Sequence, residues 1–207
     1  MAVWLHAVLK LASGASSSNL IDWLAHRGDE AIRSAGGRVW GAWDGRPGLG
    51  FGADEAVLMT AWTDDAAAGA AVELLKTCPP VIAVVGTPLH PTLRPQSDVP
   101  MTVGGAWVFR EFHVPGADVQ RFIELSASAW ETFETHFDAQ IQGLFRGPNE
   151  PGEVATLLLV TRYADHAAWE ASRKESSDPD AWARFRERHA MTRWTRARSA
   201  QLLSTDH

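Results

Sequence analysis

In the second half of the chain, apolar residues alternate with polar ones in some stretches and recur every three or four positions in others. Residues 106–114 alternate and are rich in aromatic and branched side chains, which predicts a strand. Residues 119–137 show helical spacing, which predicts an amphipathic helix with Asp118 as its cap. Further strands are predicted at 140–145, 154–163 and 195–203, and a second helix at 167–191 that is interrupted near Pro179. The predicted order is β-α-β-β-α-β.

The first half shows the same order of patterns. Strands are predicted at 3–11, 38–43, 56–62 and 81–86, with helices at 20–35 and 66–78. Gly36 and Gly37 follow the first of these helices directly and favour its end there. Each half therefore predicts the same β-α-β-β-α-β unit.

The two halves also match in register. Trp4 corresponds to Trp107, Gly41 to Gly143 and Trp62 to Tyr163, at offsets of 103, 102 and 101 residues. Several prolines between the halves indicate a stiff, extended connection. We interpret the chain as a tandem duplication, with a first unit at 1–95, a linker at 96–104 and a second unit at 105–207.

The central strands are apolar on both of their faces. Residues 57–59 and 157–160 contain no polar side chain, although a sheet with one face in water would alternate. Helices cover one face of such a sheet, so the other face must be covered as well. The predicted fold class is α+β, with two tandem ferredoxin-like units packed sheet to sheet as an α/β barrel. Pairing between chains, which would give a homo-oligomer, stays open.

Several stretches of the second half resemble a known family. They are residues 108–112, 129–134, 143–146, 160–165, 169–173 and 178–179. These stretches are similar to those of NIPSNAP-type proteins, within the dimeric α/β-barrel (ferredoxin-like) superfamily. The resemblance covers the second half well and the first half only in topology. It implies the fold more than an activity, because the biochemistry of NIPSNAP-like proteins is poorly defined.

The lumen of the predicted barrel is the natural place for a ligand. On the two first strands, the more polar phase is the better candidate for the lumen, because the helix-facing side tolerates charge poorly. The candidate ligand-binding residues are His6, Lys10, Trp62, Glu111, His113 and Tyr163. A histidine beside a carboxylate suits acid–base chemistry near neutral pH. The alternative is that the charged members lie at strand ends in solvent, with Glu111 paired to Arg110 or Arg146.

Metal and haem are not favoured by the sequence. The histidines are dispersed, without a His-x-His or His-x₃-His pair, so no metal site and no resident cofactor are predicted. Within the superfamily, the resemblance implies haem where an Asn lies on the first strand and a His on the second helix. No Asn lies on either first strand, while His166 and His189 bracket the second helix of the second half. Haem therefore stays an open alternative.

One stretch of the chain is strongly basic. Its members are Arg184, Arg186, Arg188, His189, Arg193, Arg196 and Arg198. Such a cluster can attract an anionic substrate or a carboxylate. A solvated face with salt bridges to acidic neighbours such as Glu187 is the more common outcome, and it is our interpretation.

The composition excludes several classes of function. The net charge of -6 argues against nucleic acid as a partner. The sequence contains no run of 18 apolar residues, so no membrane span is predicted. Cys78 is the single cysteine, which excludes an internal disulfide and fits a reducing, cytoplasmic location. Ten tryptophans suggest wide aromatic surfaces that either pack together or cover a pocket.

Three functions remain open from the sequence. The first is a protein that binds a small, mostly apolar organic molecule in the barrel lumen. The second is a cofactor-independent or haem-using monooxygenase, or an isomerase, as the superfamily includes. The third is a non-enzymatic assembly module whose barrel is filled by side chains.

Overall fold

The chain divides into two units, each built on four antiparallel strands. The computed structural model describes residues 2–150, 154–174 and 179–203. The first unit runs to His90 and also contains Ser97–Gly104 and the chain from Ser199 onward. The second unit contains Pro91–Gln96 and Gly105–Arg198. Both units therefore include a segment that lies outside their main stretch of sequence.

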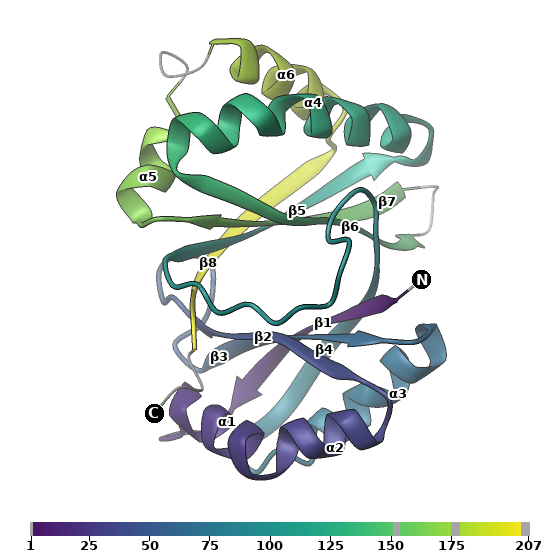
Figure 1. Ribbon diagram of the computed structural model, residues 1–207, viewed down its shortest axis with the longest axis vertical. Helices are drawn as coiled ribbons and strands as arrows, with labels where there is room; N and C mark the ends of the chain where they lie inside the picture. Colours follow the sequence, from purple (N-terminus) through teal and green to yellow (C-terminus); the bar gives the residue numbers. More distant parts are fainter. Residues whose placement is uncertain (1, 151–153, 175–178, 204–207) are drawn as a thin grey trace. The chain divides into compact units, whose positions relative to one another are not determined.

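The first unit has the strand order β4-β1-β3-β2, with every pairing antiparallel (Figure 1). Its strands are β1 (Val3–Leu11), β2 (Arg38–Gly45), β3 (Glu55–Trp62) and β4 (Val81–Pro91). Its helices are α1 (Ser17–Trp23), the π-helix η1 (Leu24–Gly28), α2 (Asp29–Ser34) and α3 (Asp65–Leu75). One face of the sheet packs against these helices, and the residues of β1 on that face are Leu5, Ala7 and Leu9, as the apolar phase predicts.

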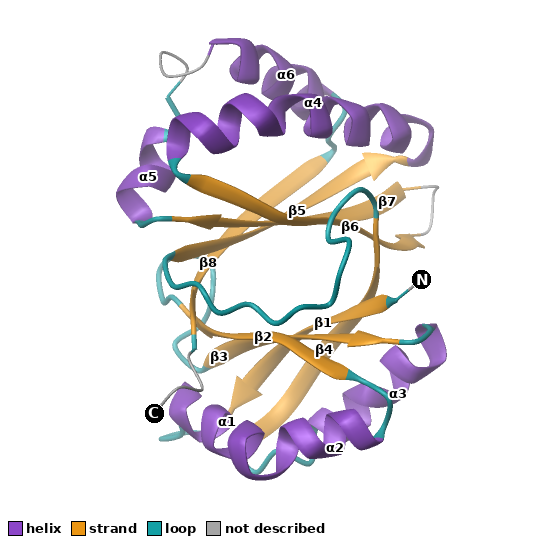
Figure 2. Cartoon of the chain, viewed as in Figure 1, coloured by secondary structure: helices purple, strands orange, loops and turns teal. Residues whose placement is uncertain are grey.

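The second unit repeats this arrangement with the order β8-β5-β7-β6. Its strands are β5 (Ala106–Pro115), β6 (Ala139–Glu150), β7 (Val154–Tyr163) and β8 (Trp194–Leu202). Its helices are the 3₁₀ turn η2 (Gly116–Asp118), α4 (Val119–Phe137), α5 (His166–Ala171) and α6 (Pro179–Ala190). Figure 2 shows α4, α5 and α6 together on one face of this sheet. The last residues of β8 belong to the first unit, where Leu202 lies opposite Trp43 of β2.

The two units share local features at the positions that the sequence aligns. Gly41 of β2 and Gly143 of β6 each follow a β-bulge in the ladder with the neighbouring strand. The side chain of Asp64 accepts a hydrogen bond from the backbone of Ala67 at 2.9 Å and so caps α3. Asp165 caps α5 in the same way. The predicted fold class, α+β with two tandem ferredoxin-like units, is confirmed.

Some element boundaries differ from the predictions. The helix predicted at 20–35 is one α-helical path broken by the π-turn η1, and it ends before Gly36, whose φ is +86°. Asp118 does not cap α4, because it lies in the preceding 3₁₀ turn with helical φ and ψ. The strand predicted at 140–145 continues to Glu150, because the ladder with β7 resumes after a second bulge. The interruption near Pro179 falls partly on residues outside the described ones, and α6 begins at Pro179.

Among the described residues, no helix has both the length and the hydropathy that crossing a bilayer requires.

Candidate functional site

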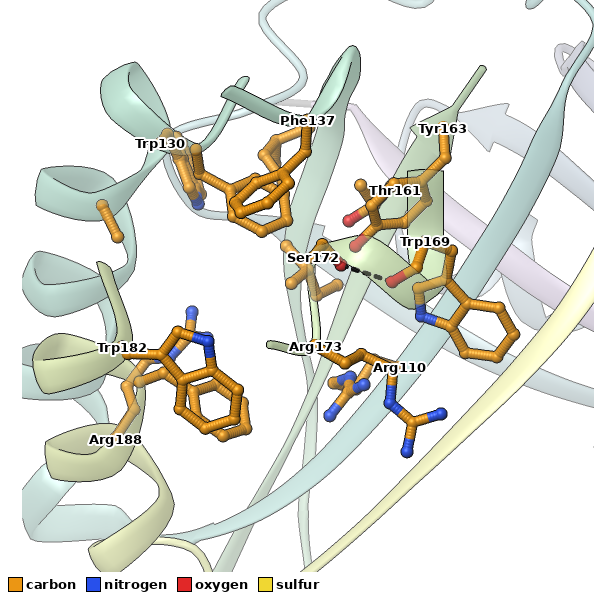
Figure 3. A pocket seen from close by; sticks show the side chains of 15 residues that line it. Arg110, Trp130, Phe137, Thr161, Tyr163, Trp169, Ser172, Arg173, Trp182 and Arg188 are labelled. Carbon is orange, nitrogen blue, oxygen red and sulfur yellow. Dashed lines mark hydrogen bonds between the residues drawn. The ribbon is translucent and has the colours of Figure 1, made fainter. Parts of the chain in front are cut away.

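A cavity of about 270 Å³ lies in the second unit, between the helix-facing side of the sheet and its three helices (Figure 3). Rings from one strand and three helices line it: Trp130, Phe133, Phe137, Tyr163, Trp169, Trp182 and Phe185. A cavity of about 150 Å³ lined by apolar side chains is large enough for benzene. The cavity of the second unit is therefore large enough for a bicyclic aromatic molecule.

Helical spacing places one wall of this cavity. Trp130, Phe133 and Phe137 are three and four residues apart, so they project from one face of α4. Trp130 and Phe137 are buried, and the Phe133 and Phe137 rings lie 5.1 Å apart. The same pattern that predicted an amphipathic helix thus builds an aromatic wall above the sheet.

The segment Pro91–Gln96 of the second unit braces this wall. Arg94 donates a hydrogen bond from Nη1 to Glu134 at 2.6 Å, and its guanidinium lies 5.0 Å from the centre of the Trp130 ring. Glu134 also accepts a hydrogen bond from the backbone N–H of Ile141 at 2.7 Å. Arg94 therefore ties the end of α4 and the start of β6 together at the edge of the cavity.

Three arginines face the cavity from different elements. Arg110 lies on β5, Arg173 follows α5, and Arg188 lies on α6 (Figure 3). Arg173 is half-exposed at the rim and forms an ion pair with Glu170 at 3.2 Å. Burial lowers the pKa of Arg110, and the nearby charge of Arg173 lowers it further. Arg110 and Arg188 are thus two cationic groups held inside an aromatic site.

Arg188 is the most deeply buried of these groups, with 9% of its surface exposed. Its guanidinium lies 5.4 Å to 5.8 Å from the ring centres of Phe112, Phe122 and Phe185, and Nη1 donates to Ser126 at 3.0 Å. Burial, with a smaller contribution from the charge of Arg110, lowers the pKa of Arg188 to about 10. Arg188 is therefore still cationic at neutral pH, in a fixed position.

Tyr163 provides a neutral hydroxyl near the arginines. Burial raises the pKa of its phenol, against the opposing effects of a hydrogen bond with Ser172 and of the charges of Arg110 and Arg188. The Ser172 hydroxyl itself donates to the carbonyl of Trp169 at 2.7 Å (Figure 3). At neutral pH the phenol keeps its proton and can donate it in a hydrogen bond.

The six residues predicted for the lumen lie on two different faces of their sheets. Trp62 belongs to the helix-facing core of the first unit, where its indole donates to Thr60 at 2.7 Å. Tyr163 belongs to the helix-facing core of the second unit and lines the cavity. On β1, His6 and Lys10 lie on the phase opposite the helix-facing Leu5, Ala7 and Leu9.

Two of these six residues, Glu111 and His113, form a pair with each other. His113 and Glu111 lie two positions apart on β5, and the imidazole Nε2 is 3.0 Å from the carboxylate. The ring of His113 also packs against Trp194 at 4.7 Å. His6 is buried, and Lys10 is exposed in an ion pair with Asp54 at 2.7 Å. A ligand-binding role for the six residues stays a prediction.

Sequence reasoning missed Arg110 and misjudged Arg188. Arg110 is the one charge on the helix-facing phase of β5, and this break in an apolar pattern is the signal that marks the site. The interpretation of the basic stretch as a solvated face is wrong for Arg188, which is buried. Glu187, next to it, does form a surface ion pair, but with Arg121 of α4 at 2.7 Å.

The cavity lining was tested against haem and metal ions. Haem iron in proteins is held by His, Cys, Met or Tyr. Of these, the described lining residues include only Tyr163, and burial raises the pKa of its phenol, which opposes a phenolate ligand. The residues present therefore do not fit haem. In the described part of the chain, no three His, Cys, Asp or Glu side chains gather as a metal site would require.

A second cavity of about 330 Å³ lies in the first unit, next to the π-helix η1. The described residues that line it are apolar except for Thr102 and Asp29, and none of them has a cationic side chain. Binding sites combine apolar walls with a few converging polar groups. The cavity of the second unit meets this description better, although it is the smaller of the two.

No protein-family model matches the chain, and no curated protein matches it in sequence. Among solved structures, an anthrone oxidase-like protein superposes with a TM-score of 0.62 at 11% identity, over 98% of this chain and 92% of that one. A chlorite dismutase variant from Candidatus Nitrospira defluvii gives 0.62 at 7% identity, over 99% and 92% of the two chains.

A third similar solved structure has the ferredoxin fold. It is an uncharacterised ferredoxin-fold protein from Listeria monocytogenes, related to antibiotic biosynthesis monooxygenases, with a TM-score of 0.53 at 9% identity over 99% and 96% of the two chains. At such identities the likeness shows the fold alone. It agrees with the ferredoxin-like fold that the sequence predicts.

Proposed function

We propose that this protein binds a small, largely aromatic organic molecule in the cavity of its second unit. The observation that carries the proposal is the ring of aromatic side chains around an open volume of about 270 Å³. Aromatic rings in the interior normally pack against one another without voids. A cavity of this size between them is a place that a flat molecule can fill, with burial of its apolar surface as the driving force.

The lining supports binding better than acid–base catalysis. Among the described residues that line the cavity, none is a carboxylate or an imidazole, and these are the usual general bases near neutral pH. Arg188 and Tyr163 keep their protons at that pH, because the pKa of Arg188 is lowered only to about 10 and burial raises the pKa of the Tyr163 phenol above its ordinary value. The cavity can therefore orient a molecule and stabilise negative charge on it, but it offers no proton acceptor.

Oxygenation of the bound molecule is a second candidate function. It is supported by structural neighbours described as anthrone oxidase-like and as related to antibiotic biosynthesis monooxygenases. The cationic side chains would then stabilise an anion formed on an acidic aromatic substrate such as a phenol. Oxygen uptake by the purified protein with 2-naphthol would favour this function, and its absence with a bound naphthol would exclude that substrate.

Two more specific hypotheses, one on the family and one on a second ligand site, rest mainly on the sequence. Membership of the NIPSNAP family rests on the stretches of the second half, without support from the sequence comparisons. A ligand site around His6, Glu111 and His113 rests on the polar phase of the first strands and on the Glu111–His113 pair. Neither hypothesis is needed for the cavity of the second unit to bind a ligand.

The proposal is tested by filling the cavity. Ala129 lines it from α4, so Ala129→Leu places three additional carbon atoms into the site. Calorimetric titration of the full chain with 2-naphthoate and 2-naphthamide should show binding of at least one probe with a Kd of about 1 mM or lower. In Ala129→Leu that Kd should rise by about tenfold or more, because the added atoms occupy the ligand's volume.

Ser128→Leu is the matched control. Ser128 is the preceding residue of α4 and is exposed outside the cavity, so the same side chain there should leave the Kd unchanged. Absence of binding by both probes, or equal effects of the two substitutions, would contradict the proposed function.

A further inference from the structure

The charges around the cavity do not balance. Arg110, Arg173 and Arg188 line it, and in the described part of the chain only Arg173 has an acidic partner, Glu170. Among residues 2–150, 154–174 and 179–203, no carboxylate forms an ion pair with Arg110 or Arg188. Buried arginines are rarely left without a counter-charge, because desolvation of an ion is expensive. The described residues therefore leave positive charge uncompensated next to the aromatic walls of the site.

Several hydrogen-bond donors around the cavity also lack an acceptor among the described residues. Within the described residues, Nε of Arg188 and the indole N–H groups of Trp130 and Trp182 are buried and have no acceptor. All three residues line the cavity, and Arg110 adds a guanidinium that makes no hydrogen bond to the described residues. Buried donors without acceptors cost free energy, and native proteins normally satisfy them. These three donors lack acceptor oxygens among the described residues, and a bound molecule could supply them.

Arg188 is also held in place for such a group. The Ser126 hydroxyl accepts one of its N–H bonds at 3.0 Å and itself donates to the carbonyl of Phe122 at 2.7 Å. The rings of Phe112 and Phe185 pack against the same guanidinium. These contacts hold the guanidinium and leave its Nε without an acceptor among the described residues. The fork is therefore preorganised before a ligand arrives.

We infer that the molecule bound in this cavity is an aromatic carboxylate, whose two oxygens accept hydrogen bonds from Arg110 and Arg188 while its ring lies against the aromatic wall of α4. This inference rests on the proposed function and names the class of its ligand. A planar carboxylate matches the fork of a guanidinium and can accept two parallel hydrogen bonds from it. The phenol of Tyr163 supplies a further donor to the same oxygens.

The test compares two probes that differ in charge and little in shape. 2-Naphthoate and its amide, 2-naphthamide, have the same ring system and nearly the same volume. Calorimetric titrations of the full chain at neutral pH and low salt should give a Kd for the carboxylate that is about 30-fold lower or more. In Arg110→Met this preference should shrink to about threefold or less, because one of the two cationic forks is gone.

Arg121→Met is the control for a general loss of positive charge. Arg121 lies on α4, is exposed and pairs with Glu187, so its replacement should leave the preference for the carboxylate unchanged. Thermal melting of each variant checks that it is folded. A carboxylate preference that disappears in Arg110→Met but not in Arg121→Met supports the inference.

The other outcomes overturn it in distinguishable ways. Equal affinity of the wild-type protein for both probes would refute the carboxylate site and leave the proposed binding function standing. Failure of both probes to bind would refute the proposed function, and the inference with it. A preference of the same size in wild type and in Arg110→Met would show that the anion does not bind where the arginines lie.

Discussion

Arg188→Met is expected to weaken the binding of 2-naphthoate by about 100-fold, with a much smaller effect on 2-naphthamide. Arg188 is the most buried cation of the cavity, and its Nε has no acceptor among the described residues. Removing one partner of a buried, hydrogen-bonded charge pair typically costs roughly 2–5 kcal/mol, and each 1.4 kcal/mol is about tenfold in affinity. Calorimetric titration of wild type and variant measures the difference directly.

The same substitution should change the stability of the empty protein little. Burial lowers the pKa of Arg188 from its ordinary value to about 10, so the folded state disfavours the cation at every pH below about 10, by about 3 kcal/mol. That cost is relieved only as the pH rises through 10. Contacts with three phenylalanine rings, each worth about 0.5–2 kcal/mol, offset most of it, and Met loses both effects together.

We therefore expect the free energy of unfolding of Arg188→Met to lie within about 1.5 kcal/mol of the wild-type value. Urea denaturation monitored by circular dichroism measures it. Ser126→Ala removes the hydroxyl that holds the guanidinium and serves as a milder comparison, with a smaller loss of affinity for the carboxylate. A strongly destabilised Arg188→Met protein that still binds 2-naphthoate as tightly would show that Arg188 is a structural residue.

Gly105→Ala is expected to destabilise the protein by about 3 kcal/mol or more. Gly105 precedes β5 and has φ +128°, a backbone conformation that residues with a Cβ rarely adopt. A Cβ at this position would also collide with the carbonyl oxygen of Tyr163, which is backbone and cannot rotate away. The start of β5 lies beside the end of β7 only because this residue is glycine.

Gly104→Ala is the matched control for that measurement. A Cβ on Gly104 would meet no atom within 4 Å, so its replacement should change the free energy of unfolding by less than about 0.5 kcal/mol. Chemical denaturation of both variants tests the pair. Equal, small effects would mean that the backbone around residue 105 can relax, and that the approach of Gly105 to Tyr163 is not required for folding.

The sequence predicts the fold well because local patterns determine most of it. The alternation on β5 and the helical spacing on α4 each identify their element, and Asp64 and Asp165 cap equivalent helices of the two units. Boundaries were missed where tertiary contacts override local signals. Strand β6 continues through Gly147 and Pro148, beyond the predicted end of the strand at residue 145, because its ladder with β7 resumes after the bulge.

The candidate site was harder to predict, because its residues come from distant parts of the sequence. Arg110 and Arg188 are 78 positions apart, and only packing of α6 over the sheet brings both to one cavity. The sequence showed a charge on the apolar phase of β5 and a basic stretch on α6, but it gave no reason to combine them. It also could not show that the Arg188 guanidinium would pack against phenylalanine rings while its neighbour Glu187 would be exposed.

The central claim is that an aromatic carboxylate binds in the cavity of the second unit, with its charge at Arg110 and Arg188. The most direct test is a crystal structure of the full chain with 6-bromo-2-naphthoate, in which anomalous scattering locates the bromine. We predict the carboxylate within hydrogen-bonding distance of both guanidinium groups and the brominated ring beside Trp130 and Phe133. Bromine located in the cavity of the first unit, or a carboxylate that contacts neither arginine, would contradict the account.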